Sequence, residues 1–189
     1  MRSTTALVVP RFRSLPALAD GAIIIAGSLV IAVLAQVSIP LWPVPITGQT
    51  LGVILVAALL GSSRGTAAVA LYLTEGAIGL PFFAGGRVGL AVLAGPTGGY
   101  LLGFVIAAWI IGTLAERGIL RRPLVATVCM VAAHIAIYVP GVTWLAQFVG
   151  SERVMAVGLY PFIAGDILKS VVAVGIVTAA GRFAKGRTT

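Results

Sequence analysis

The chain has 189 residues, of which 59% are hydrophobic and only 10% are charged, and its mean hydropathy is +1.11. A soluble domain of this length could not bury so much apolar surface, so the composition excludes a soluble globular protein and indicates a multi-pass membrane protein. The net charge of +8 is not gathered into one stripe, which argues against a nucleic acid partner, and the single cysteine, Cys129, excludes a disulfide within the chain.

Long apolar runs follow one another along the chain, whereas a β-barrel would show short segments of alternating hydrophobicity. We therefore predict an all-α membrane protein with six transmembrane helices, at about 21–41, 48–61, 65–80, 99–115, 124–140 and 158–180. These spans form one substrate-binding domain over residues 21–181. A cytoplasmic N-terminal segment, 1–20, precedes it and a basic cytoplasmic tail, 182–189, follows it.

The distribution of Lys and Arg sets the expected orientation. With six spans, the side that holds both termini carries ten basic residues: Arg2, Arg11, Arg13, Arg64, Arg117, Arg121, Arg122, Arg182, Lys185 and Arg187. The opposite side carries two, Arg87 and Arg153. Because basic residues are enriched in cytoplasmic loops, we expect both termini to be cytoplasmic.

The stretch between spans three and four, residues 81–98, is apolar yet rich in Gly and Pro. Irregular backbone at membrane depth is tolerated only where protein buries it or where it lines a cavity. We expect this segment to form an outer capping loop over the mouth of the bundle. The alternative is an apolar loop that lies on the lipid surface.

The most unusual residues in the last span are Asp166 and Lys169, in GDILKS. Each would cost about 2.5–3.5 kcal/mol at the bilayer centre. Their i, i+3 spacing places them on one helix face, where they can pair. A structural salt bridge between helices is one interpretation; a binding site for a polar ligand near the outer end of the span is the other.

Other polar residues lie inside or beside apolar runs. Thr47 and Gln49 stand where span two begins on the outer side, and Thr47 also fits a helix N-cap. Glu75 and Gln36 lie late in their spans and can reach the interface. The single histidine, His134, is expected to make a hydrogen bond between helices rather than to bind a ligand.

Several motifs indicate no chemistry in this context. GSSRG, residues 61–65, fits G-x-S-x-G but falls at a cytoplasmic turn between helices, without the strand-turn-helix context of a nucleophile. GPTGG lacks the G-K-[ST] of a phosphate loop, so the chain shows no ATPase of its own. No Cys/His cluster indicates a metal, and we expect neither an enzyme nor a cofactor.

Four stretches together resemble the BioY family, the biotin-binding S components of energy-coupling factor (ECF) vitamin transporters: VPITGQTLGVILVAALLG, RGTAAVALYLTEGAIGLPFFAGG, GPTGGYLLGF and GDILK. The resemblance runs from about residue 20 to residue 180. It implies six helices, a biotin site open to the outside, and a complex with one transmembrane coupling protein and two ATPase subunits. The family's acid and lysine of the last span map onto Asp166 and Lys169. A polar ligand contact of the family falls at FFAGGR, where this chain offers Ala84 and Arg87.

Biotin has a ureido ring, an apolar thioether ring and a valerate carboxylate. We expect Asp166 to accept a ureido N–H and Lys169 to donate to the ureido oxygen. Side chains at i and i+3 are only about 5–6 Å apart at Cβ, so the carboxylate needs another partner. Arg87 is the first candidate. Further candidates are Thr47, Gln49 and the N–H groups of Gly98 and Gly99 for the carboxylate, and Phe82, Phe83, Tyr100 and Tyr160 as apolar walls.

The expected function is thus high-affinity biotin uptake across a bacterial-type cytoplasmic membrane, with ATP energy supplied by partners. Ala22 and Ala26 in span one have the small-xxx-small spacing of a close helix contact and are a candidate docking surface. The main alternative is a solitary or proton-coupled carrier of a small vitamin, with Glu75 or Asp166 in a proton relay. An intramembrane enzyme is disfavoured because the sequence shows no nucleophile–base set, and a purely structural subunit would predict no ligand binding. A second copy of the chain, in a homo-oligomer, is a further candidate partner.

Overall fold

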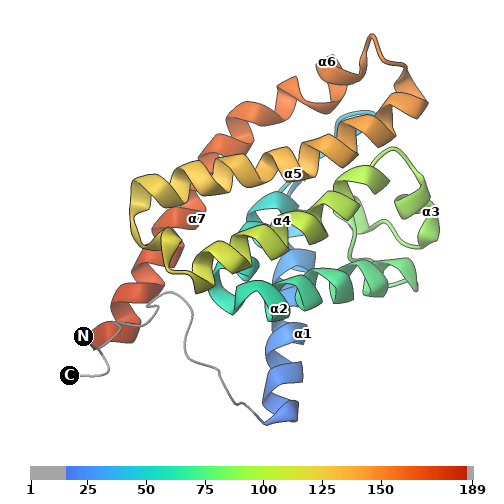
Figure 1. The fold of residues 1–189 in the computed structure, drawn as a ribbon. Coiled ribbons are helices and arrows are strands. Elements are labelled where there is room, and N and C mark those ends of the chain that lie inside the picture. Colours follow the sequence, from blue (N-terminus) through green and yellow to red (C-terminus); the bar gives the residue numbers. More distant parts are fainter. Residues whose placement is uncertain (1–15, 187–189) are drawn as a thin grey trace.

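The computed structural model describes residues 16–186, with side chains up to residue 180. Most of the expected N-terminal segment and the side chains of the expected tail therefore lie outside the described residues. The elements are α1 (Ala17–Gln36), β1 (Ser38–Ile39), β2 (Ile46–Thr47), α2 (Gln49–Ala77), η1 (Ala84–Gly86), α3 (Leu90–Ala94), α4 (Gly98–Glu116), η2 (Ile119–Arg121), α5 (Pro123–Val149), α6 (Val154–Gly158) and α7 (Tyr160–Gly186). Figure 1 shows them as a helical bundle.

Five helices in the described part of the chain are long and apolar enough to cross a membrane. The expected spans at 48–61 and 65–80 both overlap one of them, α2, which contains a non-helical residue, Gly61, at φ 85° and ψ −177°. Residues eight apart in a straight helix are separated by about 12 Å. A Cβ on Gly65, however, would lie 2.7 Å from Cα of Ala57. The two halves of α2 therefore fold back on each other at Gly61.

The fold-back at Gly61 is held by a carboxylate from α4. Glu116 accepts hydrogen bonds at Oε1 from the Ser62 backbone N–H (2.7 Å) and hydroxyl (2.9 Å). The first N–H groups of a helix have no partner within it, and a negative charge is favourable there. Arg64 pairs with Asp20 of α1 at 2.6 Å. The GSSRG residues thus serve as a helix turn, as their sequence context predicts.

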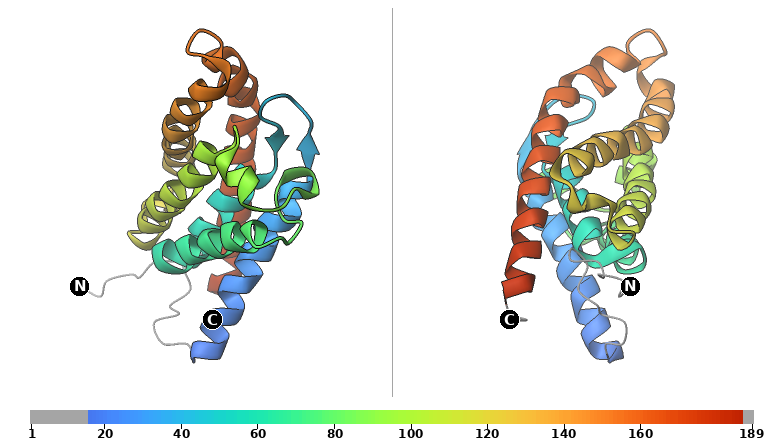
Figure 2. Two further views of the ribbon diagram at one scale, coloured as in Figure 1. Left: turned by 90° about the vertical axis from the view of Figure 1, so that its right-hand side faces the viewer. Right: turned by 60° about the vertical axis from the view of Figure 1, so that its left-hand side comes forward.

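Helix α4 lies between α2 and α5 and is the most enclosed of the long helices, whereas α1 is the least enclosed. Glycines permit this close packing. A Cβ on Gly103 would lie 2.7 Å from Cα of Ile137 in α5, and one on Gly112 would lie 2.4 Å from the Ser62 nitrogen in α2. In Figure 2, the first residues of α1 and the last residues of α7 point to the same end of the molecule.

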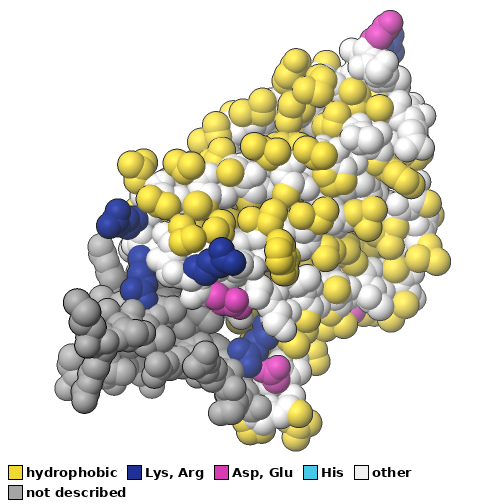
Figure 3. All heavy atoms as spheres, viewed as in Figure 1, with side chains coloured by type: hydrophobic (Ala, Val, Ile, Leu, Met, Phe, Trp, Pro, Cys, Tyr) yellow, Lys and Arg dark blue, Asp and Glu magenta, His cyan; other side chains and the backbone are white. Residues whose placement is uncertain are grey.

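The face in Figure 3 is covered by hydrophobic side chains, and its charged side chains gather mainly at two ends. Large apolar residues on the outside include Val33, Trp109, Val128, Ile135 and Leu168. Such a surface is unfavourable in water but matches the hydrocarbon core of a bilayer. Together with the five long apolar helices, it identifies a multi-pass membrane protein.

Candidate ligand-binding site

A cavity lies among α2, α4, α5, α7 and the segment 81–98. Its non-atom space, including the part that opens to solvent, is about 560 Å³. The residues that line it are Val44, Pro45, Thr47, Gln49, Thr50, Phe83, Ala84, Arg87, Val92, Thr97, Tyr100, Leu101, Phe104, Ile137, Tyr138, Phe162, Asp166 and Lys169. The walls are mainly apolar, with a few polar groups that converge on the cavity.

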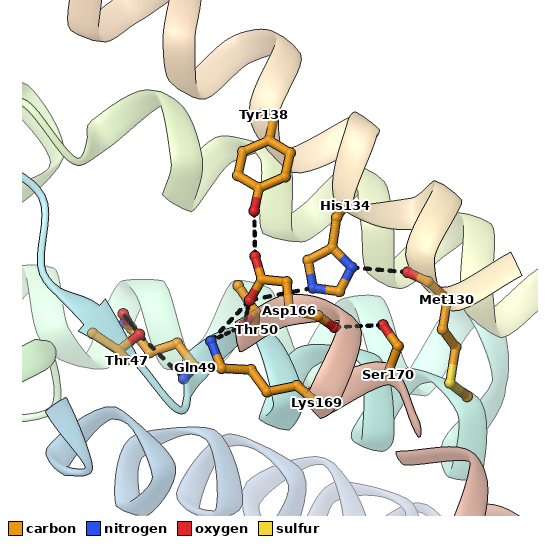
Figure 4. Close-up of polar contacts among 9 residues, drawn as sticks. All are labelled: Thr47, Gln49, Thr50, Met130, His134, Tyr138, Asp166, Lys169 and Ser170. Carbon is orange, nitrogen blue, oxygen red and sulfur yellow. Dashed lines mark hydrogen bonds and ion pairs between the residues drawn. The ribbon is translucent and has the colours of Figure 1, made fainter. Parts of the chain in front are cut away.

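Asp166 is at the centre of the main polar cluster (Figure 4). Its Oδ1 accepts from Lys169 Nζ at 2.8 Å and from the Thr50 hydroxyl at 3.0 Å, while its Oδ2 accepts from the Tyr138 hydroxyl. Lys169 also donates to the Thr50 hydroxyl oxygen at 3.0 Å. Asp166 is only 4% exposed. The pair is therefore joined to α2 and α5 and does not stand alone on α7.

The local sequence explains how these groups meet. Asp166 and Lys169 are three residues apart on α7 and share a face. Thr50 lies in the first turn of α2. Tyr138 follows His134 by four residues on α5, so both point toward α7. Three helices thus bring their polar side chains to one point.

The cluster leaves hydrogen-bonding capacity open. A carboxylate has about four acceptor positions, and Asp166 uses two at Oδ1 and one at Oδ2. An ammonium has three N–H donors, and Lys169 uses two of them within the described residues. One acceptor position on Asp166 and one N–H of Lys169 are therefore unused within the described residues, and both side chains line the cavity.

A second polar network lies where the short β1–β2 hairpin leads into α2. Ser38 pairs with Thr47 in the hairpin. The Thr47 hydroxyl donates to Gln49 Oε1 at 2.9 Å, and Gln49 Nε2 donates to the Tyr72 hydroxyl, which in turn donates to the Phe82 carbonyl at 3.2 Å. The network fixes Thr47 and Gln49 at the cavity wall and links them to the segment 81–98.

The segment 81–98 is attached to the bundle at several points. Gln36 Nε2 of α1 donates to the carbonyls of Pro81 and Phe82, at 3.4 and 3.3 Å. Phe83 is buried and meets the Tyr72 ring edge to face, with 5.8 Å between ring centroids. Because five residues of this segment (Phe83, Ala84, Arg87, Val92 and Thr97) line the cavity, it forms one wall of the site.

Arg87 reaches the cavity from that wall. Its Nε donates to the Ala84 carbonyl at 3.1 Å, which orients the guanidinium while its Nη groups make no hydrogen bond to the described residues. Ala84 lines the cavity beside it. The structure thus places a positive charge on the lining, in a different segment from Lys169.

Seven of the ten expected site residues line the cavity: Asp166, Lys169, Arg87, Thr47, Gln49, Phe83 and Tyr100. Gly98 and Gly99 do not line it. Both pack closely against neighbouring backbone, since a Cβ there would lie 1.8 Å from the Leu93 carbonyl oxygen and 2.3 Å from that of Pro140. The Gly98 N–H donates to Gly95 O. Tyr160 is 62% exposed and does not line the cavity either, nor does Phe82.

Sequence reasoning missed Thr50, Tyr138 and Phe162. The only sequence signals were that Thr50 follows Gln49, that Tyr138 is four residues from His134, and that Phe162 is four residues from Asp166. For His134 the sequence predicts a hydrogen bond between helices. Its Nδ1 lies 2.9 Å from the Met130 carbonyl of its own helix, and its Nε2 lies 3.6 Å from Asp166 Oδ1 of α7.

Comparisons with known proteins point to one family. The model of the BioY family matches residues 5–186. The "Biotin transporter BioY" of Rhizobium etli is 39% identical over 151 residues, which cover 76% of this chain and 81% of that protein. That of Thermotoga maritima is 46% identical over 144 residues, covering 76% and 84%.

The fold is also similar to that of a solved structure described as the S-component for biotin from an ECF-type ABC transporter. The TM-score is 0.79 at 26% identity, over 88% of this chain and 94% of that chain. The similarity therefore extends over most of the chain in both sequence and fold.

Proposed function

The chain belongs to the BioY family, and we propose that it captures biotin with high affinity and takes it up across the cytoplasmic membrane as the S component of an ECF-type transporter. The family consists of transporters, so the chain acts by binding and transport rather than by catalysis. Biotin is its cargo and not a cofactor.

The observation that carries the proposal is the open donor and acceptor at Asp166 and Lys169. A ureido edge presents an N–H next to a C=O. The N–H fits the free position on Asp166 Oδ2, and the C=O fits the unused N–H of Lys169. Because both partners are charged, these hydrogen bonds are stronger than neutral ones.

The rest of the cavity suits the rest of the ligand. Phe83, Tyr100 and Phe162 are apolar walls for the thioether ring. Arg87 donates to the valerate carboxylate, and Gln49, whose amide keeps a second N–H, assists it; the Thr47 hydroxyl donates to Gln49 Oε1 and holds that side chain in place. The two polar ends of biotin are then bound by different segments, as the short distance between Asp166 and Lys169 requires.

The six-span topology is part of the proposal. Each half of α2 crosses part of the membrane, and the fold-back at Gly61 is the cytoplasmic turn between spans two and three. The shared direction of the ends of α1 and α7 supports placing both termini on one side, and the excess of Lys and Arg on that side makes it cytoplasmic. The segment 81–98 then caps the outer mouth, attached through Gln36 and Phe83.

The direct test is biotin binding by the purified protein against a panel of vitamins. We expect saturable binding of biotin and none of unrelated vitamins; the absence of biotin binding would contradict the proposal. Uptake into liposomes by the protein alone, with and without a pH gradient, separates an S component from a solitary or proton-coupled carrier. An S component binds biotin but does not accumulate it without ATPase partners.

Helix α1 offers the surface for the coupling protein. Ala22 and Ala26 are exposed on the least enclosed long helix, and small residues allow another helix to approach closely. We expect an Ala22→Leu/Ala26→Leu variant to lose biotin uptake in cells several-fold while the purified protein binds biotin normally. Val33→Leu, a change of size on the exposed part of the same helix, is the control. Normal uptake in the double variant would exclude this surface.

A further inference from the structure

His134 of α5 lies next to Asp166, on the side of that residue that faces away from the ligand cavity. It is only 3% exposed and does not line the ligand cavity. Its Nε2 lies 3.6 Å from Asp166 Oδ1 and, among the described residues, has no hydrogen-bond partner. A buried polar atom without a hydrogen-bond partner costs folding free energy. Packing of the ring does not offset this cost, so we asked what Nε2 could bind.

The other ring nitrogen determines what Nε2 presents. Nδ1 lies 2.9 Å from the Met130 carbonyl. A carbonyl only accepts, so Nδ1 carries the hydrogen, and in a neutral imidazole Nε2 is then a bare lone pair. This lone pair faces a carboxylate oxygen. Two acceptors at this separation repel each other until a proton binds to Nε2.

A second hollow reaches the same point. It is lined by Val131, His134, Ile135, Tyr138, Ile163, Asp166 and Ile167 and has a non-atom space of about 420 Å³. Asp166 and Tyr138 line both hollows. Asp166 therefore separates the ligand cavity from a space that belongs to His134.

The groups around His134 determine what a bound proton would do. On α7, Asp166 carries a negative charge and Lys169 a positive one; on α5 itself, Tyr138 donates to Asp166 Oδ2. From α4, the Tyr100 hydroxyl donates to the Gly158 carbonyl, and from α2 the uncharged Thr50 hydroxyl donates to Asp166. Asp166 is thus the one acidic group in contact with His134 among the described residues.

We propose that His134 is a proton-binding site coupled to the ligand site, and that a proton on its Nε2 weakens biotin binding. The proton makes Nε2 a donor to Asp166 Oδ1. The carboxylate then shifts toward α5, away from Lys169 and Thr50, and accepts less well from the ureido N–H. The site also gains a net positive charge in a buried position. Ligand and proton therefore compete, although they occupy different sides of Asp166.

This inference rests on the proposed function, and binding at two pH values tests it. From about pH 8 to about pH 5, the range in which histidine changes charge, we expect the affinity of the wild-type protein for biotin to fall at least about tenfold, the effect of weakening one charge-assisted hydrogen bond. In His134→Gln and His134→Asn the fall is reduced to less than about threefold. Val128→Ala, a change on the lipid side of the same helix that lines neither hollow, keeps the wild-type profile. An unchanged profile in both histidine variants would overturn the proposal.

The chain contains a single histidine, so one ¹⁵N-histidine NMR signal set reports the site in the tag-free protein without any substitution. Near about pH 5 we expect imidazolium signals that saturating biotin converts to the neutral form with hydrogen on Nδ1. Asp166→Asn removes the imidazolium signals even without biotin. If the His134 signals change neither with biotin nor in Asp166→Asn, the coupling between the proton site and the ligand site is excluded. Absence of biotin binding at both pH values would instead contradict the proposed function, and the Asp166→Asn comparison would still decide the proton site.

Discussion

Replacement of Asp166 by asparagine lowers the affinity for biotin by about 100-fold or more. The amide has the same size, but its NH₂ group cannot accept. Its single uncharged oxygen cannot serve Lys169, Thr50 and Tyr138 together with the ureido N–H, as the carboxylate does. Lys169, with its side chain only 17% exposed, also loses its counter-charge. The lost charge-assisted hydrogen bond to the ureido N–H is worth about 1.5–3 kcal/mol, and the N–H left buried and unpaired adds to this cost. Each 1.4 kcal/mol is about tenfold in affinity.

Binding of labelled biotin to purified Asp166→Asn measures this effect. Asp20→Asn is the matched control. It removes a carboxylate that is ion-paired with Arg64 and does not line the cavity. We expect wild-type affinity in Asp20→Asn. Lys169→Met is also impaired, and the double variant is much less impaired than the sum of the single effects, since both residues bind one end of the ligand. Wild-type affinity in Asp166→Asn would contradict the whole arrangement of the site.

The centre of the site could be predicted from the sequence because it violates the local pattern. An acid and a base three residues apart in an apolar span have few explanations, and the helical period places them on one face. The same period explains one error. Phe162, and not Tyr160, shares the face of Asp166, since it precedes the acid by one helical turn, and Phe162 is 7% exposed whereas Tyr160 is 62% exposed.

Other parts of the site depend on contacts between helices that no local pattern encodes. Thr50 and Tyr138 are ordinary residues in their own helices, and only the packing of α2 and α5 against α7 brings them to Asp166. Gly98 and Gly99 lie in a glycine-rich stretch that resembles an anion-binding loop. Their lack of a side chain serves the close approach to Leu93 and Pro140 instead.

The turn between spans two and three also depends on a contact that the local sequence does not encode. The sequence predicts two short helices around GSSRG with a connecting turn, and in the structure the two halves of α2 meet directly at a sharp break at Gly61. The positive φ of Gly61 and the carboxylate of Glu116 allow the chain to reverse without a loop. The local sequence shows neither the backbone angle of Gly61 nor the contact of Ser62 with Glu116, which is 54 residues away. Gly61 and Arg64 indicated only that a turn lies here.

Arg87→Ala is expected to lower the affinity for biotin much more than the affinity for biotin amide, which lacks the carboxylate charge. Arg87 lies on the cavity wall formed by the segment 81–98, and its Nε is bound to the Ala84 carbonyl, which leaves the Nη groups for a carboxylate. A hydrogen bond between charged groups contributes about 1.5–3 kcal/mol, so we expect a loss of about 10- to 100-fold for biotin. Biotin amide, which has no carboxylate charge, loses less than about threefold.

Three comparisons make the Arg87 experiment specific. Arg153→Ala removes another exposed arginine that does not line the cavity, and it leaves both ligands unaffected. Arg87→Lys keeps the positive charge but loses the two-pronged geometry, so its affinity for biotin lies between those of the wild type and Arg87→Ala. Asp166→Asn weakens biotin and its amide alike, because both carry the same ureido ring. An equal loss of both ligands in Arg87→Ala would show that Arg87 holds the segment 81–98 in place and that the valerate carboxylate has another partner.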